Sequence, residues 1–405
     1  MNWKTKTRLL AGEAVLGYFE IAGSDEPLPG HLHWTPESGA IIEVVDAHWQ
    51  RPINTEHLTV HGLLEESDPV TLLDGIVRRT THDHRVKRIG SYTLAFGEHI
   101  KSDSTWDRAV YVSRNLAEWR RATGLDHSLP DGPGNRLRYR IDWEPPSTDE
   151  VSVKGARLKF ATGVESDVGL MPAYTLRSKQ HVIVEARRPQ RLEALSRSYA
   201  MPLLALTAFA ADRPDSIIEE HYSHGKGKQR IEVWRAGASM EPPEWRHNAL
   251  LFYAGELPDF RLSIVRWWRL YEKTRPALGI FGDYINEGLT FSRPRLITLH
   301  TAICGYTDAR HGHRNPRKLR AYAEVSNEVT GCSNNVLGLF GAARDYFAHL
   351  GSPGQKYSVA EIEEGTPKVT RRAAALMQAS LLTELGFTKT RASALLRRHY
   401  SNWAL

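Results

Sequence analysis

Residues 241–275 have the sequence EPPEWRHNALLFYAGELPDFRLSIVRWWRLYEKTR, and the character of the chain changes within them. Pro242-Pro243 and Pro258 interrupt regular structure. Beyond Pro258, apolar residues recur at helical spacing. The sequence therefore predicts two regions of different fold, residues 1–250 and residues 251–405.

The first region is predicted to consist mainly of β-strands. Short segments rich in β-branched and aromatic residues alternate with Gly, Pro, Asp and Ser clusters, a density that predicts an antiparallel sandwich or barrel. We expect one short helix at 116–124, one longer buried helix at 191–214 with a potential break at Pro202, and a return to strand at 228–237. The other expected strands are VLGYFEI (15–21), AIIEVV (40–45), HLTVHGLL (57–64), SYTLAF (91–96), RAVYVS (108–113), RLRYRI (136–141), VSVKGARLKF (151–160) and HVIVEA (181–186).

The second region is predicted to be all helical. In the fifth of its helices, Thr366 is the expected cap, Pro367 the first helical residue, and Gly386 the stop. The fold class is thus α+β and multidomain, with a β-rich, sandwich-like antiparallel region followed by a helical bundle. The expected helices are residues 261–275, 295–309, 317–329, 334–350, 367–385 and 390–403.

Composition bounds the class of protein. The 405 residues are 41% hydrophobic and 25% charged, which excludes a disordered chain. Two cysteines, Cys304 and Cys332, argue against a disulfide framework and for a reducing compartment. The most apolar stretch, residues 201–211, is too short to span a membrane, and Glu13 interrupts the apolar run of a signal peptide. We expect a soluble, cytoplasmic protein.

Positive charge gathers at the C-terminal end, where residues 366–405 carry seven Lys or Arg against one acid, Glu384. Such a basic face attracts RNA or DNA, although a solvated helix surface has the same composition. The candidates for contacts with an RNA backbone are Arg371, Arg372, Arg397 and Arg398.

The helix expected at 334–350 carries the candidate catalytic residues. At about 100° per residue, one apolar stripe of this helix faces the bundle, formed by Val336, Phe340, Ala343, Phe347 and Leu350. Asp345 and His349 share the opposite face, with Arg344 at its flank. A histidine can transfer protons near neutral pH, and an arginine can stabilise charge on a phosphoryl group. The same residues also fit an ordinary surface ion pair.

Other constellations are less specific. The pattern of an arginine followed five positions later by histidine recurs at Arg79–His84 and at Arg295–His300. Four residues suggest a zinc site: His300 and Cys304 on one helix, followed by His311 and His313, which lie in an expected loop. Because the two histidines fall in a loop and no second cysteine is near, we expect no metal and no cofactor. No phosphate-binding loop or nucleophile elbow occurs.

The segment ARDYFAHLG (343–351), followed by a helix that ends in LLTELGF (381–387), resembles the last part of a HEPN domain of the ApeA type, known from bacterial antiphage defence. In the first region the segments GYFEI (17–21), PGHLHW (29–34), VHGLL (60–64), VTLLDG (70–75), LAFGEH (94–99) and LAEW (116–119) occur in the order of the ApeA N-terminal domain. The family position after the arginine is usually asparagine, and here it is Asp345.

The resemblance implies a metal-independent endoribonuclease that acts in abortive infection. Arg344 would bind or stabilise phosphate, His349 would be the acid and base, and Asp345 would orient His349. HEPN domains commonly dimerise around this motif, so the resemblance implies a homodimer with RNA as substrate. The β-rich region would sense a phage-derived trigger or restrain the helical domain. The alternatives are a catalytically inactive HEPN scaffold that binds RNA or protein as a dimer, and a ligand-binding β-module with a structural helical tail.

Overall fold

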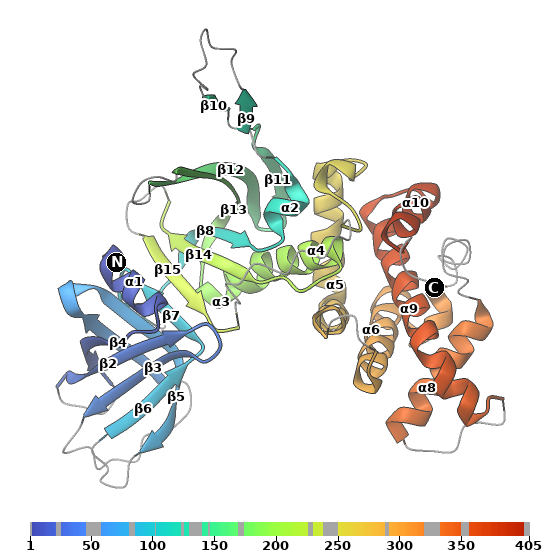
Figure 1. Ribbon diagram of the computed structural model, residues 1–405, viewed down its shortest axis with the longest axis horizontal. Helices are drawn as coiled ribbons and strands as arrows, with labels where there is room; N and C mark the ends of the chain where they lie inside the picture. The colour runs from blue at the N-terminus through green and yellow to red at the C-terminus, as the bar shows by residue number, and fades with distance from the viewer. Residues whose placement is uncertain are drawn as a thin grey trace, which may run out of the picture.

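The computed structural model describes most of the chain, namely residues 2–21, 26–45, 58–80, 86–101, 103–122, 125–128, 140–144, 146–168, 174–225, 230–237, 250–287, 291–319, 333–349 and 356–400. Strands fill the first part of the chain and helices fill the last part (Figure 1). The expected fold class, a β-rich antiparallel region followed by a helical region, is confirmed.

Six strands close into an antiparallel barrel. Their order is β5-β4-β1-β2-β3-β6, and the additional pairing of β6 with β5 completes the ring. Alternate side chains such as Val15, Phe19 and Val60 point inward and are fully buried, and Leu9 of helix α1 (Trp3–Leu10) joins them. The strands are β1 (Val15–Glu20), β2 (Leu28–Thr35), β3 (Gly39–Val45), β4 (Leu58–Leu64), β5 (Pro69–Thr80) and β6 (Val86–Ser91), with a 3₁₀ turn η1 (Glu65–Ser67).

A second, open part of the same sheet extends from the barrel in the order β7-β15-β14-β8-β13-β12-β11. Strand β7 joins the two parts, because it pairs with β5 on one side and with β15 on the other. A separate hairpin consists of β9 (Leu125–Ser128) and β10 (Arg140–Trp143). The strands of the open part are β7 (Thr93–Phe96), β8 (Trp106–Ser113), β11 (Asp149–Val153), β12 (Ala156–Val168), β13 (Tyr174–Gln190), β14 (Ile217–Ser223) and β15 (Arg230–Arg235).

Most expected strands are present, but the sequence patterns missed five: β2, β5, β6, β9 and β14. The segment 151–160, expected as one strand, is two strands, because Gly155 adopts a φ of 80° in the tight turn between β11 and β12. Three parts of the sequence predictions lie outside the described residues: His84 of the Arg79–His84 pattern, residues 136–139 of one expected strand and residues 228–229 of another.

The expected buried helix at 191–214 is continuous but irregular. It comprises α3 (Leu192–Leu195), a π-helical turn η2 (Ser196–Ala200) and α4 (Met201–Ala211). Pro202 does not end it, because the wider π-helical turn η2 directly precedes the proline, and the carbonyl of Ser198, four residues before Pro202, accepts from Nε1 of Trp268 at 3.2 Å. The short helix α2 (Leu116–Arg120) also forms within its expected range.

The helical region contains η3 (Ala254–Glu256), α5 (Phe260–Asn286), α6 (Arg293–His311), η4 (Pro316–Leu319), α8 (Asn334–His349), α9 (Val359–Leu385) and α10 (Lys389–Tyr400). Helix α5 is longer than expected and passes Pro276 by bending at Thr274, whose backbone is not helical. Of the helix expected at 317–329, residues 320–329 lie outside the described residues. No helix in the described ranges is long and apolar enough to cross a bilayer.

The predicted start of the fifth helix is wrong. Helix α9 begins eight residues earlier, where Ser358 caps it in a reciprocal capping box with Glu361. Thr366 and Pro367 lie inside the helix, and the Thr366 hydroxyl donates a hydrogen bond to the carbonyl of Ile362. The capping box of Ser358 and Glu361 therefore sets the start of α9, and Pro367, which by itself would indicate a helix start, does not. The predicted stop at Gly386 is confirmed by its φ of 102°.

The two regions share one hydrophobic core, which continues from the open sheet through α4 into α5, α6 and α9. Trp267 of α5 donates a hydrogen bond to the carbonyl of Pro202 at 2.8 Å. At the end of α4, the Asp212 carboxylate accepts from Gln378 of α9 at 2.8 Å and from His399 of α10 at 2.9 Å. The β-rich region is therefore fixed to the helices by buried contacts, with α4 between them (Figure 1).

Candidate functional site

Helix α8 presents the candidate catalytic residues on its exposed face. Val336, Phe340 and Ala343 are buried against α6 and α9, and Phe347 is half-buried, so the predicted apolar stripe is confirmed where it is described. Leu350, the last member of the stripe, lies outside the described residues. The stripe fixes the rotation of α8 and turns the candidate residues away from the core.

The structure brings the three residues together through Arg344. Its Nη1 donates to Oδ1 of Asp345 at 2.7 Å and lies 3.3 Å from Nε2 of His349. The Asp345 side chain is 68% exposed and that of Arg344 is 35% exposed. Asp345 and His349 are therefore open to solvent, and Arg344 is half-buried.

The contact with Arg344 bears on the tautomer of the histidine. A guanidinium has only donors, so a hydrogen bond at this contact requires Nε2 of His349 to accept with its lone pair. It therefore requires the imidazole with its proton on Nδ1. The same lone pair on Nε2 can take a proton from a hydroxyl group once a substrate displaces the contact with Arg344.

Asp345 contacts Arg344 and not His349. Between these described side chains, no hydrogen bond joins Asp345 to His349, although the two stand four positions apart on the helix. The carboxylate therefore restrains the arginine and neutralises part of its charge. Nε and Nη2 of Arg344 have no hydrogen-bond partner in the described residues, so that edge of the guanidinium is open to a ligand.

Helix α6 contributes two neighbours that no sequence argument connected with this site. The ring of His300 packs on Phe340 with ring centroids 5.3 Å apart, one turn before Arg344. Sγ of Cys304 lies 3.6 Å from Nδ1 of His300. Burial lowers the pKa of His300, and the positive charge of Arg344 lowers it further. Burial also raises the pKa of the Cys304 thiol, so both groups are uncharged near neutral pH.

The described residues supply two adjacent candidate ligands for the zinc site suggested by the sequence. His300 and Cys304 lie side by side as their spacing predicts, but the described residues contain no cluster of three or more potential metal ligands. His311 is the last residue of α6 and His313 follows it, both exposed. Cys332 lies outside the described residues.

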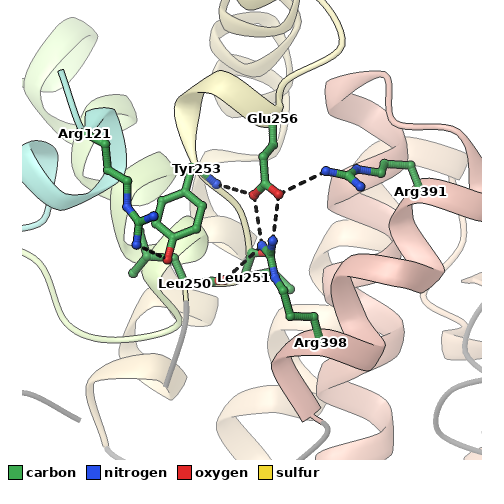
Figure 2. A network of polar contacts seen from close by, with 7 residues as sticks. All are labelled: Arg121, Leu250, Leu251, Tyr253, Glu256, Arg391 and Arg398. Atoms are coloured by element: carbon green, nitrogen blue, oxygen red, sulfur yellow. Dashed lines mark hydrogen bonds and ion pairs between the residues drawn. The ribbon is translucent and has the colours of Figure 1, made fainter. Parts of the chain in front are cut away.

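The four arginines expected to hold RNA occupy different environments. Arg371 and Arg372 of α9 are half-buried, and Nε of Arg372 is buried with no hydrogen-bond partner in the described part of the chain. Arg397 of α10 is exposed. Arg398 is held by the Glu256 carboxylate and by the carbonyl of Leu251 (Figure 2). The structure does not gather the four into one surface around Arg344 and His349.

Comparison with protein families identifies the first region. The model of the family described as ApeA N-terminal domain 1 matches residues 14–227, more than half of the chain. The match runs from the first strand of the barrel to just past β14, and it includes α4 but none of the helices from α5 onward. No curated protein and no solved structure gives a match. The chain belongs to the ApeA family of antiphage defence proteins.

Proposed function

We propose that the protein is a metal-independent endoribonuclease of the HEPN type that acts in abortive infection, with its active residues on α8. The observation that carries the proposal is the contact of Nη1 of Arg344 with Nε2 of His349, 3.3 Å apart on an exposed helix face. An imidazole can carry out the proton transfers of phosphodiester cleavage, and a guanidinium with spare donors can stabilise the charge that develops on the phosphoryl oxygens.

The chemistry follows from these two groups. His349 takes the proton of a ribose 2′-hydroxyl, whose oxygen attacks the adjacent phosphorus. Arg344 donates from Nε and Nη2 to the phosphoryl oxygens, on which negative charge increases in the transition state. The bond from phosphorus to the 5′-oxygen breaks, and that oxygen takes the proton back from the protonated His349. The products are a 2′,3′-cyclic phosphate and a 5′-hydroxyl.

The open face of α8 supports a composite site. Arg344, Asp345 and His349 are turned away from their own core, so a second copy of the chain can face them with the same residues. Two such faces would form one groove with two Arg–His pairs. In this arrangement residues 251–405 form the catalytic domain, and residues 1–250 sense a phage-derived trigger or restrain that domain.

The decisive experiment incubates purified protein with total RNA in excess EDTA and analyses the ends of the fragments. Wild type is expected to release fragments with 2′,3′-cyclic phosphate ends, whereas Arg344→Ala and His349→Ala release far fewer. His313→Ala is the matched control, because His313 is also exposed but lies after α6. Toxicity on expression in bacteria, compared across the same variants, detects an enzyme that is latent after purification.

Two results would contradict the proposal. One is cleavage by the Arg344→Ala and His349→Ala variants at the wild-type rate. The other is a protein that cleaves RNA while light scattering shows only monomers, which would remove the composite groove.

One observation favours the inactive scaffold as a second candidate. Asp345 occupies the same guanidinium nitrogen that contacts His349, and a carboxylate repels a phosphate. The scaffold predicts that wild type, Arg344→Ala and His349→Ala all bind RNA or protein and that none of them cleaves RNA or is toxic.

A further inference from the structure

One face of α5 carries a row of cations. Arg266, Arg269 and Lys273 are spaced by three and four residues, so they follow one another along the helix surface. Together with Arg310 of α6 and Glu384 of α9 they line a cavity of about 420 Å³. None of the residues that line it belongs to α8, so this is a different site from Arg344 and His349.

The cavity is strongly positive because its single acid is already paired. Glu384 accepts from Arg310 at 2.6 Å and from the Tyr306 hydroxyl at 3.3 Å. Arg266, Arg269 and Lys273 are exposed and form no ion pair with any described residue. Three positive charges without an acidic partner therefore line one cavity. They repel one another, and a bound anion would reduce this repulsion.

The backbone helps to place one of them. Gly386 ends α9 with a φ of 102°, and Nη1 of Arg266 occupies the space that a Cβ on Gly386 would need. The guanidinium therefore rests over the C-terminal end of α9, where the helix dipole favours a cation. Ser263 of the same helix as Arg266 donates to the carbonyl of Leu385 at 2.8 Å and holds the two helices in register.

A second cavity of about 780 Å³ adjoins the first, and Arg269 lines both. Its own acid, Glu272, is paired with Lys154. Its wall combines α5 with residues from β13 and η2, so the N-terminal and helical regions both contribute. Across the two cavities, the exposed cations without an acidic partner in the described residues are Arg187, Arg197, Arg266, Arg269, Lys273 and Arg275.

The lining shows which anion fits. The first cavity has no aromatic side chain among its described residues, and the aromatic rings of the second, Tyr199, Trp268 and Tyr271, are buried in the core. A base therefore finds no ring on which to stack, whereas arginine forks match phosphate oxygens. From Arg266 to Arg275 the helix spans about 14 Å, which is long enough for several successive phosphates.

We propose that this α5 surface, defined by those six cations, binds the phosphate backbone of an RNA strand without reading its sequence. The choice of RNA over another strand of phosphates rests on the proposed function. The bases would point to solvent, and the strand would contact the ApeA N-terminal domain and the helical region at once.

The test measures binding by fluorescence anisotropy of labelled single-stranded RNA, with His349→Ala in the background so that the strand stays intact. The triple variant Arg266→Gln/Arg269→Gln/Lys273→Gln is expected to lose about tenfold or more in affinity. Its slope of log K against log salt concentration should fall by about 2, since each phosphate contact on a single strand contributes about 0.7. The charge-matched control Lys4→Gln/Lys101→Gln/Arg230→Gln changes three exposed cations outside the surface and should bind as the parent does.

A single charge reversal at the junction of the two cavities gives an independent measurement. Arg269→Glu should weaken binding more than Arg230→Glu, and both proteins should melt at the parent temperature because both positions are exposed. Equal binding by the triple variant and its control overturns the proposal. Inorganic tripolyphosphate that binds as tightly as RNA overturns the assignment of RNA and identifies a small-anion site.

The two proposals can fail separately. If wild type cleaves RNA and the α5 variants keep full affinity, the α5 surface is refuted and the nuclease stands. If the α5 variants lose affinity but wild type never cleaves RNA, the surface stands and the nuclease is refuted.

Discussion

Arg398 of α10 and Arg344 of α8 are both arginines of C-terminal helices, and the structure places them in opposite situations. Arg398 contacts both oxygens of Glu256 at 2.7 and 2.9 Å and the carbonyl of Leu251 at 3.0 Å (Figure 2). Arg344 meets its neighbours through Nη1 and keeps the rest of its guanidinium open. The difference shows that an arginine can bind a ligand only where neighbouring carboxylates and carbonyls do not already occupy its N–H donors.

The largest expected effect separates the two arginines by activity. Arg344→Ala should lower the rate of RNA cleavage by about 10²–10³-fold, the usual loss when one donor to a developing oxyanion is removed. The melting temperature should stay at the wild-type value because Arg344 anchors nothing in the core. Single-turnover cleavage measures the rate, and a thermal melt of the same preparation measures the melting temperature. An Arg344→Ala variant that melts earlier but keeps full activity would contradict this prediction.

The second effect concerns stability. Arg398→Ala should lower the free energy of unfolding by about 2 kcal/mol, because it removes charged hydrogen bonds and leaves the half-buried Glu256 without its main partner. Arg391→Ala is the matched control: this exposed arginine makes one contact with the same carboxylate and should cost at most about 1 kcal/mol. Urea unfolding measures the free energy of unfolding of both variants. Equal losses would show that Arg398 contributes no more to stability than Arg391.

A smaller effect is expected at Asp345. Asp345→Asn removes the charge that holds Nη1 of Arg344 and should raise RNA cleavage by up to about fivefold, which corresponds to the roughly 1 kcal/mol of an exposed ion pair. Steady-state cleavage rates measure it. A loss of activity in Asp345→Asn would mean that the carboxylate assists the reaction.

The smallest effect is a dependence of stability on pH. Burial alone would raise the pKa of Glu256. The hydrogen bonds from Arg398 and from the Tyr253 backbone, together with the positive charges of Arg398 and Arg391, outweigh burial and hold the pKa below the usual 4.5. The folded state therefore gains stability from Glu256 above pH 4.5 and loses it as the pH falls through the folded pKa. The difference in free energy of unfolding between wild type and Glu256→Gln should shrink between about pH 6 and about pH 3. A constant difference would exclude this linkage.

Several features were predictable because they depend on residues close together in the chain. The periodic stripe of Val336, Phe340 and Ala343 is enough to place Arg344 and His349 on the outer face of α8. The same period applied to residues 266–273 would have found the row of cations on α5. The contact of Asp345 with Arg344 was less predictable. Helix geometry places both Arg344 and His349 near the Asp345 carboxylate, and the sequence does not show which of them it contacts.

The sequence by itself determined the order of β-rich and helical regions, the face of α8 that bears the candidate residues, and the stop at Gly386, because periodicity and backbone preference act over a few residues. Only the tertiary structure decided which charges are neutralised. Glu256 lies 142 positions from Arg398, and Arg269 meets residues of β13 and η2 in one cavity wall. Electrostatic pairing depends on distance in space, and a linear pattern does not contain that distance.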